Sequence, residues 1–186
     1  MNKKEILQNI LMCDNVVGNL RSNLQNLTLI IPEISDMIGF EHKHPHHHLD
    51  VWEHTLCALN YSPKNFDIRL ILLLHDIGKP HSFQDNEVRH FKGHPEASAE
   101  IANKALERLN YNEKYINYIC KIIARHDMPL TKQEIISDRT LSKVIFTVQK
   151  CDAFAHNPAT NKKRLEYIEN TTKIFNETKP LSKNVL

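Results

Sequence analysis

The sequence predicts an all-α protein built as a single-domain helical bundle. Apolar residues recur at helical spacing along most of the chain, whereas the alternating pattern of a β-strand is scarce. Residues 70–74 are five consecutive aliphatic residues, too few to cross a bilayer and too apolar for a surface, so they indicate a buried segment. A length of 186 residues, with 41% hydrophobic and 25% charged residues, suits one ordinary globular domain.

The first half of the chain contains five expected helices. Apolar stripes predict helices over residues 3–13 and 15–30, and Pro32 opens a short third one that runs to Ile38. Asp50 is expected to cap a helix over residues 51–60, and the next covers residues 66–77, where Gly78 and Pro80 stop it. Residues 81–93 then form a polar loop, with a small hairpin around Asp85 and Asn86.

The second half adds helices with clear boundary signals. Pro95 fits the first turn of a helix that ends at Leu109, and a helix over residues 112–126 ends before Pro129. Thr131 and Glu134 match a capping box, and Asp138 caps a helix over residues 139–155. A last helix carries the apolar stripe Leu165, Ile168 and Phe175, and the tail from Lys179 is expected to be loose.

Charge and cysteine content leave the partner open but narrow the setting. The formal charge is only +2 without a dense basic block, which argues neither for nor against nucleic acid. The four cysteines form no Cys-x-x-Cys pair, which argues against a zinc ribbon or a thioredoxin-like site. Because no signal peptide or long apolar run is present, we expect a cytoplasmic protein that does not contact a membrane.

Polar residues on apolar helical faces indicate a metal site. Asp152 follows Val148 by four residues, a spacing that aims its carboxylate into the core, and His54 and His126 occupy similar inward positions. The pair His75-Asp76 ends the buried aliphatic segment. Each residue alone is explained by a satisfied core hydrogen bond. Together, the two imidazoles and two carboxylates of His54, His75, Asp76 and Asp152 suit a divalent ion such as Mn, Fe, Co, Ni or Zn.

These residues resemble the metal-binding pattern of the HD superfamily of metal-dependent phosphohydrolases, whose fold is an all-α bundle. In particular, four stretches in order are similar to the HD domain attached to bacterial tRNA CCA-adding nucleotidyltransferases: residues 32–34, 47–56, 75–80, and 90–94 with 98–99. The resemblance implies an HD core over residues 31–158, N-terminal helices over 1–30 packing on it, and a C-terminal helix and tail over 159–186. No nucleotidyltransferase motif is present, so we expect a free-standing HD protein.

The resemblance also implies a ligand set and residue roles. It implies two divalent ions, Mn, Fe, Ni, Co or Mg, bridged by Asp76, with one ion as the alternative. Asp76 would orient or deprotonate the attacking water, and Lys79 would neutralise charge on phosphorus, which makes both catalytic. The metal ligands would be His54, His75, Asp76, His94, His126 and Asp152. The substrate-binding residues would be Lys79, His47, His90 and Arg125.

The expected function is hydrolysis of a small nucleotide or a terminal RNA phosphate, either a phosphomonoester or a 2′,3′-cyclic phosphodiester. The alternatives are a diadenosine tetraphosphate hydrolase and a non-catalytic nucleotide-sensing or RNA-binding module. No obligate protein partner is expected. Trp52 and Phe91 are aromatic residues that could stack on a base. Four histidines are expected to lie exposed in a loop, where they could bind metal adventitiously: His42, His44, His46 and His48.

Overall fold

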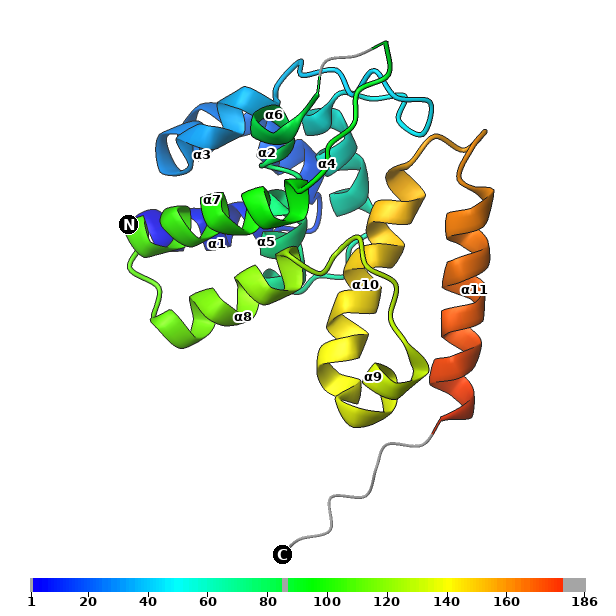
Figure 1. Ribbon diagram of the computed structural model, residues 1–186. Helices are drawn as coiled ribbons and strands as arrows, with labels where there is room; N and C mark the ends of the chain where they lie inside the picture. Colours follow the sequence, from blue (N-terminus) through cyan, green and yellow to red (C-terminus); the bar gives the residue numbers. More distant parts are fainter. Residues whose placement is uncertain (1, 85–86, 179–186) are drawn as a thin grey trace, which may run out of the picture.

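Helices carry nearly all of the regular structure in the computed structural model, which describes residues 2–84 and 87–178 (Figure 1). Within these ranges the only strand-like pairings are two isolated antiparallel bridges, between Glu41 and Asp50 and between Gln84 and His90. The prediction of a single all-α domain is therefore confirmed. The predicted hairpin tip at Asp85 and Asn86 and the tail from Lys179 lie outside the described residues.

The N-terminal elements are α1 (Lys3–Leu11), α2 (Val16–Ser22), α3 (Leu24–Ile30) and the 3₁₀ helix η1 (Pro32–Met37). The single helix predicted over residues 15–30 is wrong, because the chain leaves helical geometry at Asn23 (φ −110°, ψ 17°). Its side-chain amide donates to the carbonyl oxygen of Asn19 at 2.9 Å. Asparagine competes for backbone groups in this way and so ends α2 and begins α3.

The middle elements are α4 (Val51–Asn60), α5 (Phe66–Leu74) and α6 (Lys79–Ser82). Asp50 caps α4 as predicted, since its carboxylate accepts from the backbone N–H of Glu53 at 2.8 Å. The helix predicted over residues 66–77 ends at Leu74, where a tighter turn joins the N–H of Ile77 to the carbonyl of Leu74. Pro80 does not stop this segment but lies in the first turn of α6, where its missing N–H costs little.

The C-terminal elements are α7 (His94–Arg108), α8 (Glu113–Ile123), α9 (Lys132–Ser137), α10 (Arg139–Ala155) and α11 (Lys162–Glu177). The capping box at Thr131 and Glu134 is present. The helix predicted over residues 112–126 ends at Ile123, because i to i+3 hydrogen bonds tighten its last turn. In α11 the predicted stripe is only partly buried, since Leu165 is 38% exposed.

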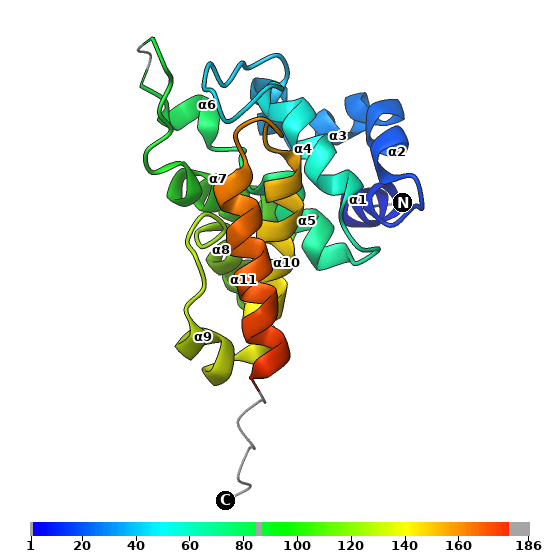
Figure 2. The same ribbon diagram turned by 90° about the vertical axis from the view of Figure 1, so that its right-hand side faces the viewer.

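The helices surround a core centred on α5. Residues 70–74 are fully buried, and α5 contacts α1, α4, α7, α8 and α10. Helices α7 and α8 form one pair, α4 packs on α10, and α11 lies beside α10 in both views (Figures 1 and 2). Helices α4, α7, α8 and α10 therefore all contact this buried helix.

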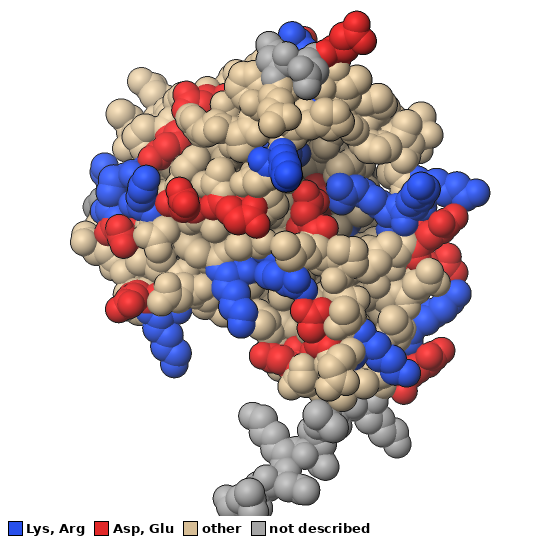
Figure 3. Space-filling view, viewed as in Figure 1, with Lys and Arg blue, Asp and Glu red and all other residues tan. Residues whose placement is uncertain are grey.

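The surface carries charges of both signs. On the face shown in Figure 3, lysine and arginine alternate with aspartate and glutamate and do not form one basic patch.

No helix among the described residues is long and apolar enough to cross a bilayer. The boundaries drawn at residues 31 and 158 stay predictions.

Candidate metal centre

Six buried side chains converge where α4, α7 and α10 meet the turns that follow α5 and α8. Asp76 lies at the centre: its Oδ2 is 3.3 Å from His75 Nε2 and 3.5 Å from His54 Nε2. Its Oδ1 is 3.2 Å from His94 Nε2 and 3.7 Å from His126 Nε2. Asp152 Oδ1 lies 2.9 Å from His54 Nε2. The structure thus brings together all six residues that the sequence proposed as ligands.

The ring orientation of the four histidines is fixed by the backbone. The Nδ1–H groups donate to carbonyl oxygens: His75 to Leu72 at 2.7 Å, His94 to Phe91 at 2.9 Å and His126 to Ile123 at 2.7 Å. His54 Nδ1 faces the carbonyl of Ala155 at 3.3 Å. A carbonyl oxygen can only accept, so each Nδ1 carries the proton. Every Nε2 is therefore turned toward the carboxylates, which is the arrangement of metal-ligating histidines.

The donor atoms form two groups that share Asp76. In each group the donor atoms lie within 4.8 Å of one another, and the groups are His54, His75, Asp76 and Asp152, and Asp76, His94 and His126. Mixed imidazole and carboxylate donors of this kind suit first-row divalent ions. A shared carboxylate with one oxygen toward each group fits two neighbouring ions.

Buried polar atoms in this centre lack partners, which tests the fit of a metal. His75 Nε2 and both carboxylate oxygens of Asp76 have no hydrogen-bond partner among the described residues, although Lys79 Nζ forms an ion pair at 2.7 Å with Oδ2. The lone pairs of His94 Nε2 and His126 Nε2 face each other at 3.3 Å. Such contacts are costly unless a proton or a cation lies between the atoms. The residues present therefore fit bound divalent ions.

The charges of the cluster are strongly coupled. Burial disfavours the imidazolium of His75, but the Asp76 and Asp152 carboxylates outweigh it and raise the pKa of His75 to about 10. Burial by itself would raise the pKa of Asp76, yet His75 and Lys79 hold that pKa well below its usual value. Burial lowers the pKa of His54. The cluster thus keeps its carboxylates ionised and needs positive charge to balance them.

His42 is buried, contrary to the prediction that it lies exposed in the loop. It is only 2% exposed, because its Nδ1–H donates to the Leu49 carbonyl at 2.8 Å and its ring stacks on His47. Its Nε2 accepts from Lys79 Nζ at 3.1 Å. Burial, with Lys79 nearby, lowers the pKa of His42 to about 2. Neutral His42 therefore directs the Lys79 ammonium toward Asp76.

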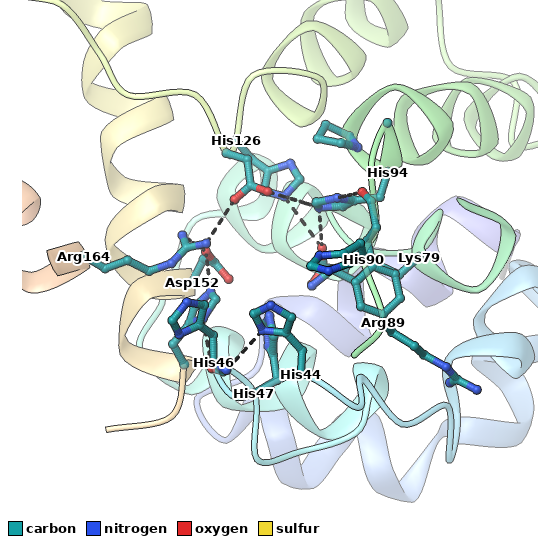
Figure 4. Close-up of a pocket in the computed structure, with 16 residues that line it drawn as sticks. His44, His46, His47, Lys79, Arg89, His90, His94, His126, Asp152 and Arg164 are labelled. Atoms are coloured by element: carbon teal, nitrogen blue, oxygen red, sulfur yellow. Dashed lines mark hydrogen bonds and ion pairs between the residues drawn. The ribbon is translucent and has the colours of Figure 1, made fainter. Parts of the chain in front are cut away.

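A cavity of about 310 Å³ opens above the cluster (Figure 4). His47, His90 and Phe91 line it, as does Lys79. Among the loop histidines, His46 and His48 are exposed as predicted, whereas His44 is half-buried. His44 and His46 both line the cavity.

Two residues considered for substrate contact lie elsewhere. Arg125 does not line the cavity, because its guanidinium pairs with Glu134 at 2.6 Å. Trp52 is 3% exposed and belongs to the apolar core, so it cannot stack on a ligand in this cavity. The cavity therefore recruits neither side chain.

Three cavity residues that contact the clustered side chains were not predicted from the sequence. Asp127 Oδ2 lies 3.4 Å from His94 Nε2, and His156 Nε2 lies 3.4 Å from Asp152 Oδ2. Arg164 Nη1 donates to the same Asp152 oxygen at 3.2 Å. Asp127 repeats the His-Asp pairing after His126, and His156 follows Asp152 by one helical turn, so both carried a local signal. Arg164 carried none.

Comparison with known proteins gives one family and two relatives. The sequence model of the HD domain matches residues 46–155, more than half of the chain. A CC-adding tRNA nucleotidyltransferase of Thermus thermophilus is 32% identical over 66% of this chain and 30% of its own length. An A-adding tRNA nucleotidyltransferase of Deinococcus radiodurans is 33% identical over 56% of this chain and 26% of its own length. The chain therefore matches under a third of either relative.

Proposed function

Because the chain belongs to the HD domain family, whose members are typically metal-dependent phosphohydrolases, we propose that it hydrolyses phosphate esters with divalent ions held at Asp76. The observation that carries this proposal is the buried carboxylate of Asp76, which has an ion pair with Lys79 but no hydrogen-bond partner among the described residues, and which lies between two groups of histidine nitrogens. A purely structural site would satisfy these atoms with protein donors. Atoms left unpaired at the base of a cavity instead support a site that holds an ion and a ligand.

The proposed metal ligands are divided between the two groups. His54, His75, Asp76 and Asp152 would hold one ion, and His94 and His126 would hold the second together with Asp76. Two divalent ions supply Lewis-acid activation of water and of the phosphoryl group. A site that holds one ion is the alternative, and metal content separates the two.

The chain's own groups supply the remaining chemistry. Asp76 is ionised, so its negative charge can orient the attacking water at the ions it would hold. Lys79 Nζ, only 2.7 Å from Asp76, places a fixed positive charge beside the position where charge develops on the phosphoryl oxygens. His90 and His47 line the cavity wall and can donate to substrate oxygens.

The proposed substrate is a small nucleotide or a terminal RNA phosphate, as a phosphomonoester or a 2′,3′-cyclic phosphodiester. The cavity volume of about 310 Å³ lies at the lower end of the size range of small-ligand sites. Both relatives are tRNA nucleotidyltransferases by name, which supports an RNA or nucleotide ligand. Phe91 at the cavity wall offers an aromatic ring for a base.

The test is a substrate panel with added Mn²⁺ or Ni²⁺. We expect turnover of bis-p-nitrophenyl phosphate or 2′,3′-cyclic AMP, abolished in Asp76→Ala while circular dichroism shows an intact fold. The matched control is Asp14→Ala, which removes an exposed carboxylate that pairs with Lys64 at 2.6 Å and does not line the cavity. His48→Gln reports any contribution of adventitious metal at the loop.

Other outcomes would redirect the proposal. Rapid cleavage of diadenosine tetraphosphate with inert cyclic nucleotides and monoesters would identify a dinucleoside polyphosphate hydrolase. Tight nucleotide binding without turnover under any metal would contradict hydrolysis and identify a sensing or RNA-binding module.

A further inference from the structure

We propose that Arg164 forms a phosphate-binding subsite on the α11 side of the cavity, so that α11 takes part in substrate recognition. This inference rests on the proposed function and adds a residue that lies outside the HD domain match at residues 46–155. Arg164 extends from α11 toward the cavity, on the side opposite Lys79 and His90 (Figure 4).

The position of Arg164 is fixed by carboxylates at the edge of the cluster. Its Nη1 donates to Asp152 Oδ2 at 3.2 Å, and its Nη2 approaches Asp127 Oδ1 at 3.5 Å. A guanidinium has five N–H donors in a planar fork, so these two contacts leave donors available. Its side chain is 41% exposed, and the guanidinium therefore has donors that solvent or a ligand can reach.

The other permanent cations of the cavity are already committed. Lys79 is enclosed, with a side chain 6% exposed that pairs with Asp76 and His42. Arg89 donates to the Glu41 carbonyl at 2.7 Å, and its guanidinium stacks on two aromatic rings. Arg164 is thus the cavity arginine that contacts the clustered carboxylate of Asp152 and, beside it, the carboxylate of Asp127.

The charge balance of the cavity favours an anion once metal is bound. Three carboxylates and three permanent cations line it: Asp76, Asp127, Asp152, Lys79, Arg89 and Arg164. These charges cancel formally, so each divalent ion adds an excess of two positive charges. Asp152 separates Arg164 from the histidines by the width of one carboxylate, since Oδ2 contacts Arg164 and Oδ1 contacts His54. A phosphate group at the cluster therefore lies within reach of the guanidinium fork, which matches phosphate geometry.

The test measures binding of inorganic phosphate to the Mn²⁺-loaded protein by titration calorimetry. We expect Arg164→Gln to weaken phosphate affinity about tenfold or more, the usual effect of losing a charge-assisted hydrogen bond. Arg164→Lys keeps the positive charge but lacks the planar fork of donors, so its phosphate affinity should lie between those of the wild type and Arg164→Gln. The matched control is Arg108→Gln, which removes an arginine paired with Glu33 at 2.7 Å outside the cavity and should leave phosphate affinity unchanged.

A second measurement distinguishes phosphate binding by Arg164 from a role of Arg164 in positioning Asp152. Mn²⁺ affinity, followed by electron paramagnetic resonance, should be unchanged or tighter in Arg164→Gln, because a cation next to a ligand carboxylate is removed. Weaker Mn²⁺ binding with unchanged phosphate affinity would overturn the inference and leave Arg164 as a positioning residue. Absence of phosphate binding to the wild-type protein would also overturn it.

The inference and the proposed function fail separately. Phosphate binding that depends on Arg164, in a protein that hydrolyses no ester, supports the inference and rejects the hydrolase. Turnover in which Arg164→Gln changes neither KM nor phosphate affinity supports the hydrolase and rejects the inference.

Discussion

At the scale of single residues, the chemistry of the site follows from which groups are buried and which partners they have. Asp76 is ionised and buried, and it has an ion pair with Lys79 but no hydrogen-bond partner among the described residues. A buried carboxylate is costly unless it is both paired and hydrogen-bonded. His42 shows the opposite arrangement, because both ring nitrogens have partners, and acceptance from Lys79 at Nε2 requires the neutral imidazole. Together these two residues hold Lys79 in place.

His42 predicts a pH dependence of stability. The pKa of His42 is lowered to about 2 in the folded protein. On acidification His42 is therefore protonated near pH 6.5 in the unfolded chain but stays neutral at that pH in the folded protein. Its contribution to the free energy of unfolding is present above pH 6.5 and is lost as pH falls below that value. Between pH 7.5 and 5.5 this loss is about 1.4 kcal/mol.

Urea unfolding of the metal-free protein at the two pH values measures this term. In His42→Gln the loss of unfolding free energy on acidification should be smaller by about 1.4 kcal/mol, whereas the exposed control His48→Gln should behave as wild type. Equal losses in wild type and His42→Gln would refute the assignment of a neutral, buried His42.

At the scale of elements, the turn between α5 and α6 sets the position of the His75-Asp76 pair. Gly78 lies against the start of α7, where its N–H donates to the Ser98 hydroxyl at 2.9 Å. A Cβ at this position would collide with the backbone nitrogen of Ser98 and the carbonyl carbon of Ala97. Glycine is therefore required here for close approach, at an ordinary φ of −84°.

Gly78→Ala should consequently destabilise the protein by about 1–3 kcal/mol, the usual cost of forcing extra volume into a packed contact. Ser98→Ala, which removes only the hydroxyl acceptor, should cost about 1 kcal/mol. Chemical denaturation of both variants measures the difference. If Gly78→Ala were as stable as wild type, the close packing of α6 on α7 would not determine the position of the turn.

The elements also show how far the sequence could predict the site. Helical spacing identified His54 and Asp152, because each shares an apolar face with buried neighbours. Arg164 could not be found in this way, since it lies on α11, 12 residues after Asp152, and reaches the site across the gap between two helices. The burial of His42 depends on a loop whose path is set by long-range contacts, and loops have no periodic signal.

At the scale of the whole molecule, the clustered histidines and aspartates of the candidate metal centre join elements from residue 54 to residue 152. Bound ions would therefore act as a cross-link between helices that are distant in sequence. Helical periodicity was enough to predict the all-α fold class and its apolar core. It could not predict the break at Asn23 or the early ends of α5 and α8, because these depend on local hydrogen bonds.

Metal binding should accordingly stabilise the entire fold. Free Mn²⁺ at about 100 times its dissociation constant should raise the free energy of unfolding by about 2.7 kcal/mol, or roughly 5–10 °C in Tm. Thermal unfolding in Mn²⁺ and in a chelator measures the shift, and Asp76→Asn should remove it. A Tm unaffected by both Mn²⁺ and chelator would argue against a metal centre in the core.

Anomalous diffraction at the manganese edge, from crystals of the Mn²⁺-loaded protein, tests directly whether divalent ions bind at Asp76. We expect anomalous density between Asp76 and the imidazoles, with one ion toward His54, His75 and Asp152 and a second toward His94 and His126. Anomalous density confined to the loop histidines His44, His46 and His48, with none beside Asp76, would contradict it.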